Sequence, residues 1–409
     1  MSDQDATPQA TPEYAGWFGA DPDLPNFKLN PHGAYKHLRE TAPVNLTPND
    51  MWRLTRYEDI QRLLKHTPAG MRDSEGLIAG MTKEESDANR FILQMDPPDH
   101  DRIRRLVSKA FTPSALTALG PLVQQSIDQE LDKLDPHNPA IDVIPNLALP
   151  VPAASICAML GVPFSDKEML SEWVSLATYR LAAGAYPQMQ EQAAEALQNL
   201  ITYMMALIEE RRENPTDDIL GALVSAEEEG DRLDVEELLF NSIGLLIAGL
   251  ETTIGLIAHA MRCFARFPDQ WELLYQQPEL LESAIEECLR FEPSVPLTLR
   301  TLHEDTEFGG IIIPKDSRIM AVLIAGNRDP AVFSDPDNFD ITRNEARHCS
   351  FGGGIHFCLG SHLARLNTEI ALSAMVARFS SLELNDEDIE WAPSLFRIPG
   401  KMPMQFTRR

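Results

Sequence analysis

The feature that most constrains the fold is a long helical segment, Val235–Phe267, whose centre is apolar on almost every face. Only four residues between Ile243 and Met261 interrupt it: Glu251, Thr252, Thr253 and His259. A membrane-spanning helix is one interpretation, but a carboxylate at the bilayer centre costs roughly 2.5–3.5 kcal/mol. A helix that is apolar all round is otherwise a central, buried helix. The segment therefore predicts a core built around it, and 44% apolar residues suffice to surround it.

The rest of the chain reads as mostly helical, with a small β region after Pro293. Proline and glycine breaks separate the predicted helices, which are 31–40, 58–65, 119–134, 148–160, 166–183, 188–212, 217–229 and 359–379. Short runs rich in β-branched residues predict strands in 44–55, 297–302, 307–313 and 318–323, and in the tail up to Arg409. We predict one mainly α domain over residues 23–409, preceded by a flexible tail, residues 1–22.

Charge and cysteine content narrow the function. The chain has 35 Lys and Arg against 62 Asp and Glu, a formal net charge of -27. Nucleic-acid binders need an excess of cationic side chains, so no nucleic-acid partner is expected. Five scattered cysteines imply no disulfide framework and favour a reducing cytoplasm. The polar N-terminus resembles neither a signal peptide nor a membrane anchor, so we expect a cytoplasmic location.

The chemistry concentrates in the stretch Phe351–Gly360, where glycines precede Cys358 and a predicted helix. A helix N-terminus favours thiolate over thiol, so Cys358 is a candidate axial ligand for a flat metal cofactor. Three alternatives each explain part of the stretch. The first is a buried structural cysteine. The second is a phosphate loop, although the third glycine and a following Gly-Lys-Ser/Thr are missing. The third is a zinc site, although the paired C-x(2–4)-C spacing is missing; its candidate ligands are His348, Cys349, His356, Cys358 and His362.

The stretch resembles, at every fixed position, the haem-ligand signature of the cytochrome P450 family, F-G-x-G-x-(H/R)-x-C-x-G. Further motifs of that family follow the right order through most of the chain. The resemblance implies the cytochrome P450 fold, with haem b (iron protoporphyrin IX) buried between the long central helix and the helix after the cysteine loop. It implies Cys358 as the iron ligand, and further haem contacts from His100, Arg104, Ala248, Gly249, Arg300, Phe351, Gly352, His356 and Gly360.

Glu287-Cys288-Leu289-Arg290 is similar to the family's E-x-x-R motif. Without the family, an i,i+3 pair on a helix is a surface ion pair worth a few tenths of a kcal/mol. The resemblance instead implies a buried structural cluster that Arg343 completes and that holds the cysteine loop.

Ala248-Gly249-Leu250-Glu251-Thr252 matches the family's (A/G)-G-x-(D/E)-T inside the central helix. The small Ala248 and Gly249 leave room for a flat cofactor and a small gas ligand. A threonine hydroxyl can bond back to the carbonyl four residues earlier and bend the helix. The resemblance implies that Glu251 and Thr252 deliver protons in catalysis, and the alternative is a helix kink with a satisfied Glu251.

The resemblance implies a monooxygenase that uses O2 to hydroxylate or epoxidise a lipophilic small molecule. No flavin or iron–sulfur motif is visible, so electrons would come from a separate ferredoxin or flavodoxin with an NAD(P)H reductase. A basic surface of Arg102, Arg105, Lys109 and Arg365 is the predicted docking surface. A peroxide-driven peroxygenase is the main alternative, disfavoured by the intact Glu251-Thr252, and a non-enzymatic haem or gas-binding protein is another.

Family position also predicts the substrate pocket. The predicted lining is mainly apolar and suits a lipophilic ligand: Met71, Ile78, Phe91, Leu93, Leu181, Leu245, Val295, Leu297 and Phe396. Arg72 or Arg180 could bind a substrate carboxylate, although a surface position is the simpler interpretation for each.

Overall fold

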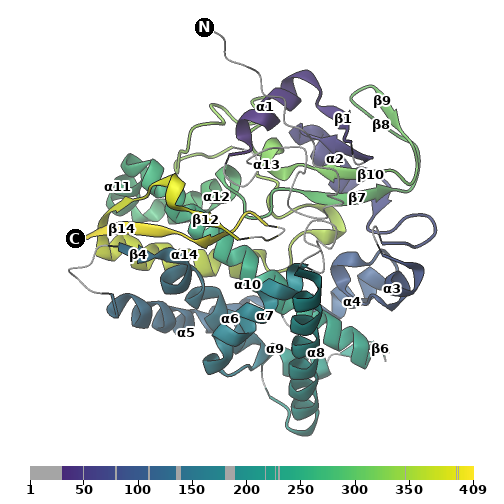
Figure 1. The fold of residues 1–409 in the computed structure, drawn as a ribbon, viewed down its shortest axis with the longest axis horizontal. Coiled ribbons are helices and arrows are strands. Elements are labelled where there is room, and N and C mark those ends of the chain that lie inside the picture. The colour runs from purple at the N-terminus through teal and green to yellow at the C-terminus, as the bar shows by residue number, and fades with distance from the viewer. Residues whose placement is uncertain are drawn as a thin grey trace.

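The computed structural model describes residues 30–48, 50–78, 81–108, 111–134, 140–179, 189–216, 218–225, 227–228, 231–345, 347–392, 394 and 396–409. The predicted tail, its boundary at residue 22, and the predicted roles of Lys109, Arg180 and Leu181 lie outside these residues. Within them, a large helical part packs beside a smaller β part, as expected (Figure 1).

The predicted central helix is α10, Val235–Arg266. It begins with a capping box, in which the Asp234 side chain accepts from the Glu237 N–H and the Glu237 carboxylate accepts from the Asp234 N–H. By length and composition α10 could cross a membrane, but 72% of its most apolar window is buried inside the fold. The helix therefore fills the role predicted from its sequence, that of a buried core helix.

The other helices surround α10 or flank the β part. α10 packs against α6 (Pro150–Leu160), α7 (Lys167–Ala177), α8 (Gln190–Glu213), α12 (Leu281–Phe291) and α14 (Ser361–Arg378). The remaining α-helices are α1 (His32–Thr41), α2 (Tyr57–His66), α3 (Lys83–Ala88), α4 (Asp99–Ser108), α5 (Pro113–Asp132), α9 (Ile219–Ser225), α11 (Pro268–Gln276) and α13 (Leu323–Gly326).

The β part is a five-stranded sheet in the order β1-β2-β10-β7-β3. Its strands are β1 (Val44–Leu46), β2 (Met51–Leu54), β3 (Ala69–Gly70), β7 (Thr298–Leu302) and β10 (Arg318–Ala321). β10 pairs in parallel with β2 and antiparallel with β7, so the N-terminal strands join the region after Pro293 in one sheet. β7, which carries Arg300, lies between β10 and β3 in this sheet.

Smaller β elements complete the fold. β11 (Phe379–Glu383), β14 (Pro403–Arg408) and β4 (Ala140–Asp142) form a three-stranded sheet in the order β11-β14-β4. Separate hairpins pair β5 (Glu227–Glu228) with β6 (Asp231–Arg232), β8 (Thr306–Phe308) with β9 (Ile311–Ile313), and β12 (Glu390–Trp391) with β13 (Pro399–Lys401).

Several secondary-structure predictions were wrong in detail. The helix predicted at 119–134 is α5, which begins earlier, at Pro113, because the Thr112 side chain caps its N-terminus. The predicted helix 217–229 ends at Ser225, because the next residues pair as β5 and β6. The run 307–313 is a hairpin outside the main sheet, because Gly309 and Gly310 turn the chain with φ of +57° and +82°.

A buried charged cluster ties distant segments to α10. Glu292, whose side chain is 1% exposed, accepts from His32 Nε2 at 3.0 Å and from Arg397 Nη1 at 2.5 Å. Arg262 of α10 lies 3.4 Å away and also binds Asp386. Burial alone would raise the pKa of Glu292, but Arg397, His32 and Arg262 hold it well below its usual value. This Glu292 cluster fixes the segment that carries Phe396 and Arg397.

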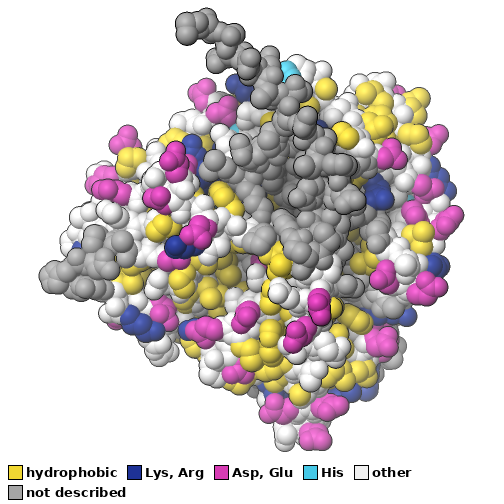
Figure 2. All heavy atoms as spheres, in the orientation of Figure 1, with side chains coloured by type: hydrophobic (Ala, Val, Ile, Leu, Met, Phe, Trp, Pro, Cys, Tyr) yellow, Lys and Arg dark blue, Asp and Glu magenta, His cyan; other side chains and the backbone are white. Residues whose placement is uncertain are grey.

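Acidic side chains are spread over the face in Figure 2, with fewer Lys and Arg among them. This distribution is what the net charge of -27 leads one to expect. Among the side chains that Figure 2 colours, Lys and Arg form no continuous basic surface of the kind that binds nucleic acid.

Candidate active site

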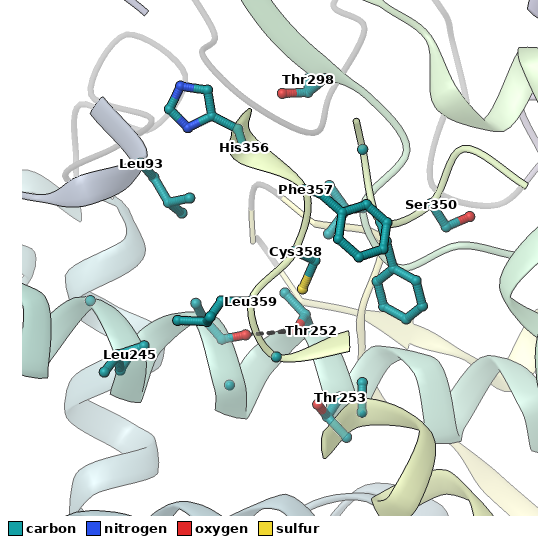
Figure 3. A pocket seen from close by; sticks show the side chains of 18 of the residues that line it. Leu93, Leu245, Thr252, Thr253, Thr298, Ser350, His356, Phe357, Cys358 and Leu359 are labelled. Carbon is teal, nitrogen blue, oxygen red and sulfur yellow. Dashed lines mark hydrogen bonds between the residues drawn. The ribbon is translucent and has the colours of Figure 1, made fainter. Parts of the chain in front are cut away.

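A pocket opens between α10 and the cysteine loop, close to where the β sheet meets the helical part. Figure 3 shows Cys358 above α10, with its sulfur directed toward the helix turn that carries Thr252. Leu93 and Leu245 both lie toward one side of this space, Leu93 in its upper part and Leu245 in its lower part, and His356 lies at its upper edge. The pocket therefore has a thiol on one wall, a helix with an alcohol on the opposite wall, and apolar side chains between them.

Glycines shape the cysteine loop. Gly352 and Gly354 have φ of +69° and +64°, which disfavours side chains. A Cβ on Gly354 would lie 2.1 Å from the Leu64 carbonyl oxygen, so the loop rests directly on α2. The Cys358 N–H donates to the Phe351 carbonyl at 3.0 Å, which closes the loop. α14 begins at Ser361, three residues after Cys358.

The backbone N–H at the start of α14 acts on Cys358 in the predicted direction, but burial opposes it. Burial raises the pKa of the Cys358 thiol. The Gly360 N–H, Arg104 and Arg365 act in the opposite direction, but they do not outweigh the burial. A bound metal cation would supply the missing positive charge, since a coordinating thiol is deprotonated.

Four basic side chains converge at the edge of the pocket. The rings of His100 and His356 meet at 4.4 Å between centroids, and Arg104 Nη2 donates to the Phe357 carbonyl at 2.7 Å. Arg300, 7% exposed, donates to neutral groups, and burial lowers its pKa to about 10. Burial, Arg300, His100 and Arg104 lower the pKa of His356 to about 3.

This basic cluster is incomplete as it stands. Both ring nitrogens of His356 and Nε2 of His100 are buried without a hydrogen-bond partner among the described residues. Buried polar atoms are normally paired, and a buried guanidinium such as that of Arg300, which donates to the neutral Thr298 hydroxyl and Leu299 carbonyl, is best satisfied by an anion. A flat apolar cofactor with carboxylates at one edge, such as haem, fits both the slot beside Cys358 and this basic edge.

The predicted cofactor residues gather at this pocket. Its lining includes Arg104, Ala248, Gly249, Arg300, Phe351, Gly352, His356, Cys358 and Gly360. His100 does not line the pocket and reaches it through its contact with the His356 ring. Gly249 also contacts α6, since a Cβ at this position would lie 2.4 Å from Ile156 Cδ1 and would require that side chain to move.

The Thr252 hydroxyl is held within α10, whereas the Thr252 backbone carbonyl and the Glu251 carboxylate accept from serines outside the helix. The Thr252 hydroxyl donates to the Ala248 carbonyl at 2.7 Å (Figure 3). The Ser294 hydroxyl donates to the Thr252 carbonyl at 2.8 Å, and the Ser394 hydroxyl donates to Glu251 Oε2 at 3.3 Å. Glu251 is buried and does not line the pocket, whereas Thr252 does.

A buried ion cluster supports the cysteine loop from behind. Glu287 binds Arg290 through two contacts of 2.7 and 2.8 Å, and Arg343 lies 3.2 Å from the same carboxylate. Arg290 also donates to the Asn327 carbonyl at 2.9 Å. The Asn327 amide in turn binds the Cys349 N–H and the Ser350 hydroxyl, so the cluster connects to the loop through Asn327.

The pocket wall is mainly apolar. Of the predicted lining residues, Met71, Phe91, Leu93, Leu245, Val295, Leu297 and Phe396 line it, whereas Ile78 is buried elsewhere. The proposal that Arg72 binds a substrate carboxylate was wrong, because its guanidinium donates to the backbone carbonyls of Gly76, Ser86, Asn89 and Gln94.

The predicted basic docking surface is not a set of free cations. Arg102 pairs with Glu237, and Arg365 binds Glu286 with contacts of 2.7 and 3.0 Å. Two of its four members thus carry carboxylate partners from α10 and α12. The zinc alternative also finds no support, since no group of three or more His, Cys, Asp or Glu among the described residues could hold a metal ion.

Sequence reasoning missed Ser294, Ser394 and Asn241, which position α10 and the pocket wall. Serine and asparagine occur throughout the chain, so their residue types gave no signal. Ser294 follows Pro293 at the end of the α12 region, and this adjacency to the predicted pocket was the only available indication.

Known proteins are similar to this chain in sequence and fold. The family model described as Cytochrome P450 matches residues 17–401. Cytochrome P450 107B1 of Saccharopolyspora erythraea is 37% identical over 396 residues, which cover 93% of this chain and 96% of that protein. The 6-deoxyerythronolide B hydroxylase of the same organism is 35% identical over 395 residues, which cover 91% and 96%. The crystal structure of P450BioI in complex with a fatty-acid-ligated acyl carrier protein has a TM-score of 0.85 and 34% identity, covering 93% of this chain and 98% of that one.

Proposed function

The chain belongs to the cytochrome P450 family, and on this premise we propose that it inserts one oxygen atom of O2 into a lipophilic small molecule, with electrons from a separate redox protein. Members of the family are haem-thiolate monooxygenases. The observation that carries the proposal is the placement of Cys358 opposite Thr252 in one pocket, beside a basic cluster in which buried histidine nitrogens have no hydrogen-bond partner among the described residues.

Haem b fits this pocket, and each predicted contact has a chemical reason. Cys358 would ligate the iron, and His100, Arg104, Arg300 and His356 would bind the propionates through charge-assisted hydrogen bonds. When bound, the haem supplies the chemistry that activates O2, and thiolate ligation favours O–O cleavage. The chain supplies ligation, orientation and protons.

The Thr252 hydroxyl has a defined polarity. Its proton is directed at the Ala248 carbonyl, so the lone pairs of Oγ1 are free to accept a proton donor that enters the pocket. The Glu251 carboxyl lies one residue before it, where Ser394 holds Oε2. We propose that Glu251 brings protons inward to Thr252 Oγ1, while the apolar wall excludes bulk water.

We also propose a redox partner and a cellular location for the enzyme. The redox protein is a ferredoxin or flavodoxin with its NAD(P)H reductase, and the working location is the cytoplasm. The related hydroxylase is named for 6-deoxyerythronolide B and the related structure contains hexadec-9Z-enoic acid, so relatives differ in the molecules that they act on or bind. An apolar pocket supports a lipophilic substrate here.

The test of the haem proposal is the spectrum of the reduced protein with carbon monoxide. We expect the Soret band at the thiolate position, and a band at the imidazole position would reject Cys358 as the ligand.

The test of the proton route is Thr252→Ala in the presence of a surrogate ferredoxin and reductase, with Thr253→Ala on the same helix as control. We expect Thr252→Ala to divert a larger share of the supplied electrons into hydrogen peroxide instead of oxidised substrate. An unchanged share of electrons in oxidised substrate would contradict the route. Full turnover with peroxide alone would favour the peroxygenase alternative.

A further inference from the structure

Asn241 of α10 fastens the pocket wall that includes Phe91. Its Oδ1 accepts from the Ile92 N–H at 3.1 Å, and its Nδ2 donates to the Arg90 carbonyl at 2.9 Å. Nδ2 also donates to the Glu237 carbonyl of its own helix at 2.7 Å, and the side chain is buried. One amide therefore holds the backbone on both sides of Phe91 to α10.

Gly244 lies three residues further along α10, on the same helix face. A Cβ at Gly244 would lie 2.0 Å from Phe91 Cε2 and 2.5 Å from Cδ2. The Phe91 ring thus rests against bare helix backbone. Gly244, Phe91 and Leu93 all line the pocket, and Figure 3 shows Leu93 on the same side as Leu245 of α10.

Together these contacts determine where the ring can go. Because Arg90 and Ile92 are fastened by Asn241, the Phe91 backbone cannot retreat from α10 with its side chain. A side chain at position 244 would force the ring to turn, and the open direction is the pocket. A close-packed interior has no free space for an added methyl group, so overpacking of this kind displaces neighbouring side chains.

We propose that Asn241 and Gly244 form a clamp that fixes the Phe91–Leu93 wall and thereby sets the upper size of apolar ligand that the pocket admits. The clamp rests on the proposed function, since it defines specificity at the same pocket. Asn241 and Gly244 are positioning residues that act through Phe91.

The experiment uses the haem-loaded protein and two probes, imidazole and clotrimazole, an imidazole with three aryl rings on one carbon. Both probes bind iron through nitrogen, and their dissociation constants are measured from the Soret shift. The ratio of the two constants therefore reports the effect of the pocket wall on ligand size and cancels the effect of the iron–nitrogen bond. We expect Gly244→Ala to weaken clotrimazole about tenfold relative to imidazole. We expect Phe91→Ala to shift the ratio the opposite way.

The decisive comparison is Gly244→Ala in the Phe91→Ala background. Without the ring the added methyl group has room, so the expected further change in the ratio is none. An equal effect of Gly244→Ala in both backgrounds would overturn the proposal, as would an unchanged ratio for both single variants. If Gly244→Ala does not accumulate, Phe91→Ala alone still tests the wall.

Asn241→Leu tests the fastening, with Ser242→Ala as the matched control. Ser242 is the adjacent buried residue of α10 and does not line the pocket. In Asn241→Leu we expect faster deuterium exchange at the Ile92 amide and a shift of the ratio of dissociation constants in favour of clotrimazole over imidazole. We expect neither change in the control. Unchanged exchange and ratio would contradict the clamp. Loss of the thiolate carbon monoxide band in the unmodified protein would instead reject the haem proposal, so the two failures are distinguishable.

Discussion

We expect Glu292→Gln to lower the free energy of unfolding by about 3–5 kcal/mol, the usual cost of removing one partner from a buried ion pair. Glu292 is fully buried and contacts His32, Arg262 and Arg397 at 3.0, 3.4 and 2.5 Å. Glutamine keeps the shape and removes the charge, so the variant isolates electrostatics from packing.

The loss should fall chiefly on Arg397. Arg262 retains its two contacts with Asp386, whereas the Arg397 side chain is 0% exposed and cannot recover the loss by hydration. Since whole domains are stable by about 5–15 kcal/mol, a change of this size is a large part of the total.

The assay is equilibrium urea unfolding of the haem-loaded protein at pH 7, followed by circular dichroism. Glu390→Gln is the matched control, because Glu390 pairs with Lys401 at 2.8 Å with both side chains more than half exposed. Exposed pairs contribute little, so the control should leave the urea midpoint unchanged. The same midpoint for Glu292→Gln and Glu390→Gln would refute the reasoning from burial.

Three further predictions concern the ligand, the loop and pH. Cys358→His should move the carbon monoxide Soret band to the imidazole position, and an unmoved band would mean another ligand. Gly354→Ala should reduce haem occupancy and stability by at least about 1–2 kcal/mol, the cost of a left-handed residue, whereas Gly353→Ala, at φ of -169°, should cost less; equal losses would contradict this. Burial lowers the pKa of His259 from 6.5 to about 3, so its stability contribution is complete above pH 6.5 and falls as pH drops toward 3. Between pH 7 and pH 5, His259→Gln should therefore lose about 2 kcal/mol less stability than the unmodified protein. Urea titrations of both proteins at the two pH values measure this, and an equal loss in the two would contradict the reasoning.

The sequence predicted the elements whose signals are local. α10 follows from a run of apolar residues with few interruptions, and the cysteine loop from glycines at fixed spacing before Cys358. The contact between Thr252 and Ala248 follows from helix geometry alone. These predictions needed no knowledge of what lies across the fold.

Contacts between distant segments were not predictable in the same way. Ser394 binds Glu251 from 143 residues away, and Asn241 binds backbone groups of Arg90 and Ile92. A backbone carbonyl is present at every residue, so the sequence does not indicate which carbonyl an asparagine will find. For the same reason Arg72 was considered for a substrate carboxylate or a surface position, although its guanidinium binds backbone carbonyls of residues 76–94.

Phe396 and Arg397 are neighbours with opposite surroundings, since Phe396 lines the pocket and Arg397 is locked into the Glu292 cluster. The Arg397 N–H also donates to the Ser294 carbonyl, and its own carbonyl accepts from His259. Substrate preference and thermal tolerance are therefore linked along this short stretch of chain. Directed evolution toward a larger substrate should find few acceptable changes around Phe396, and more on the side of Leu93 and Leu245, where pocket shape can vary without disturbing the charged core.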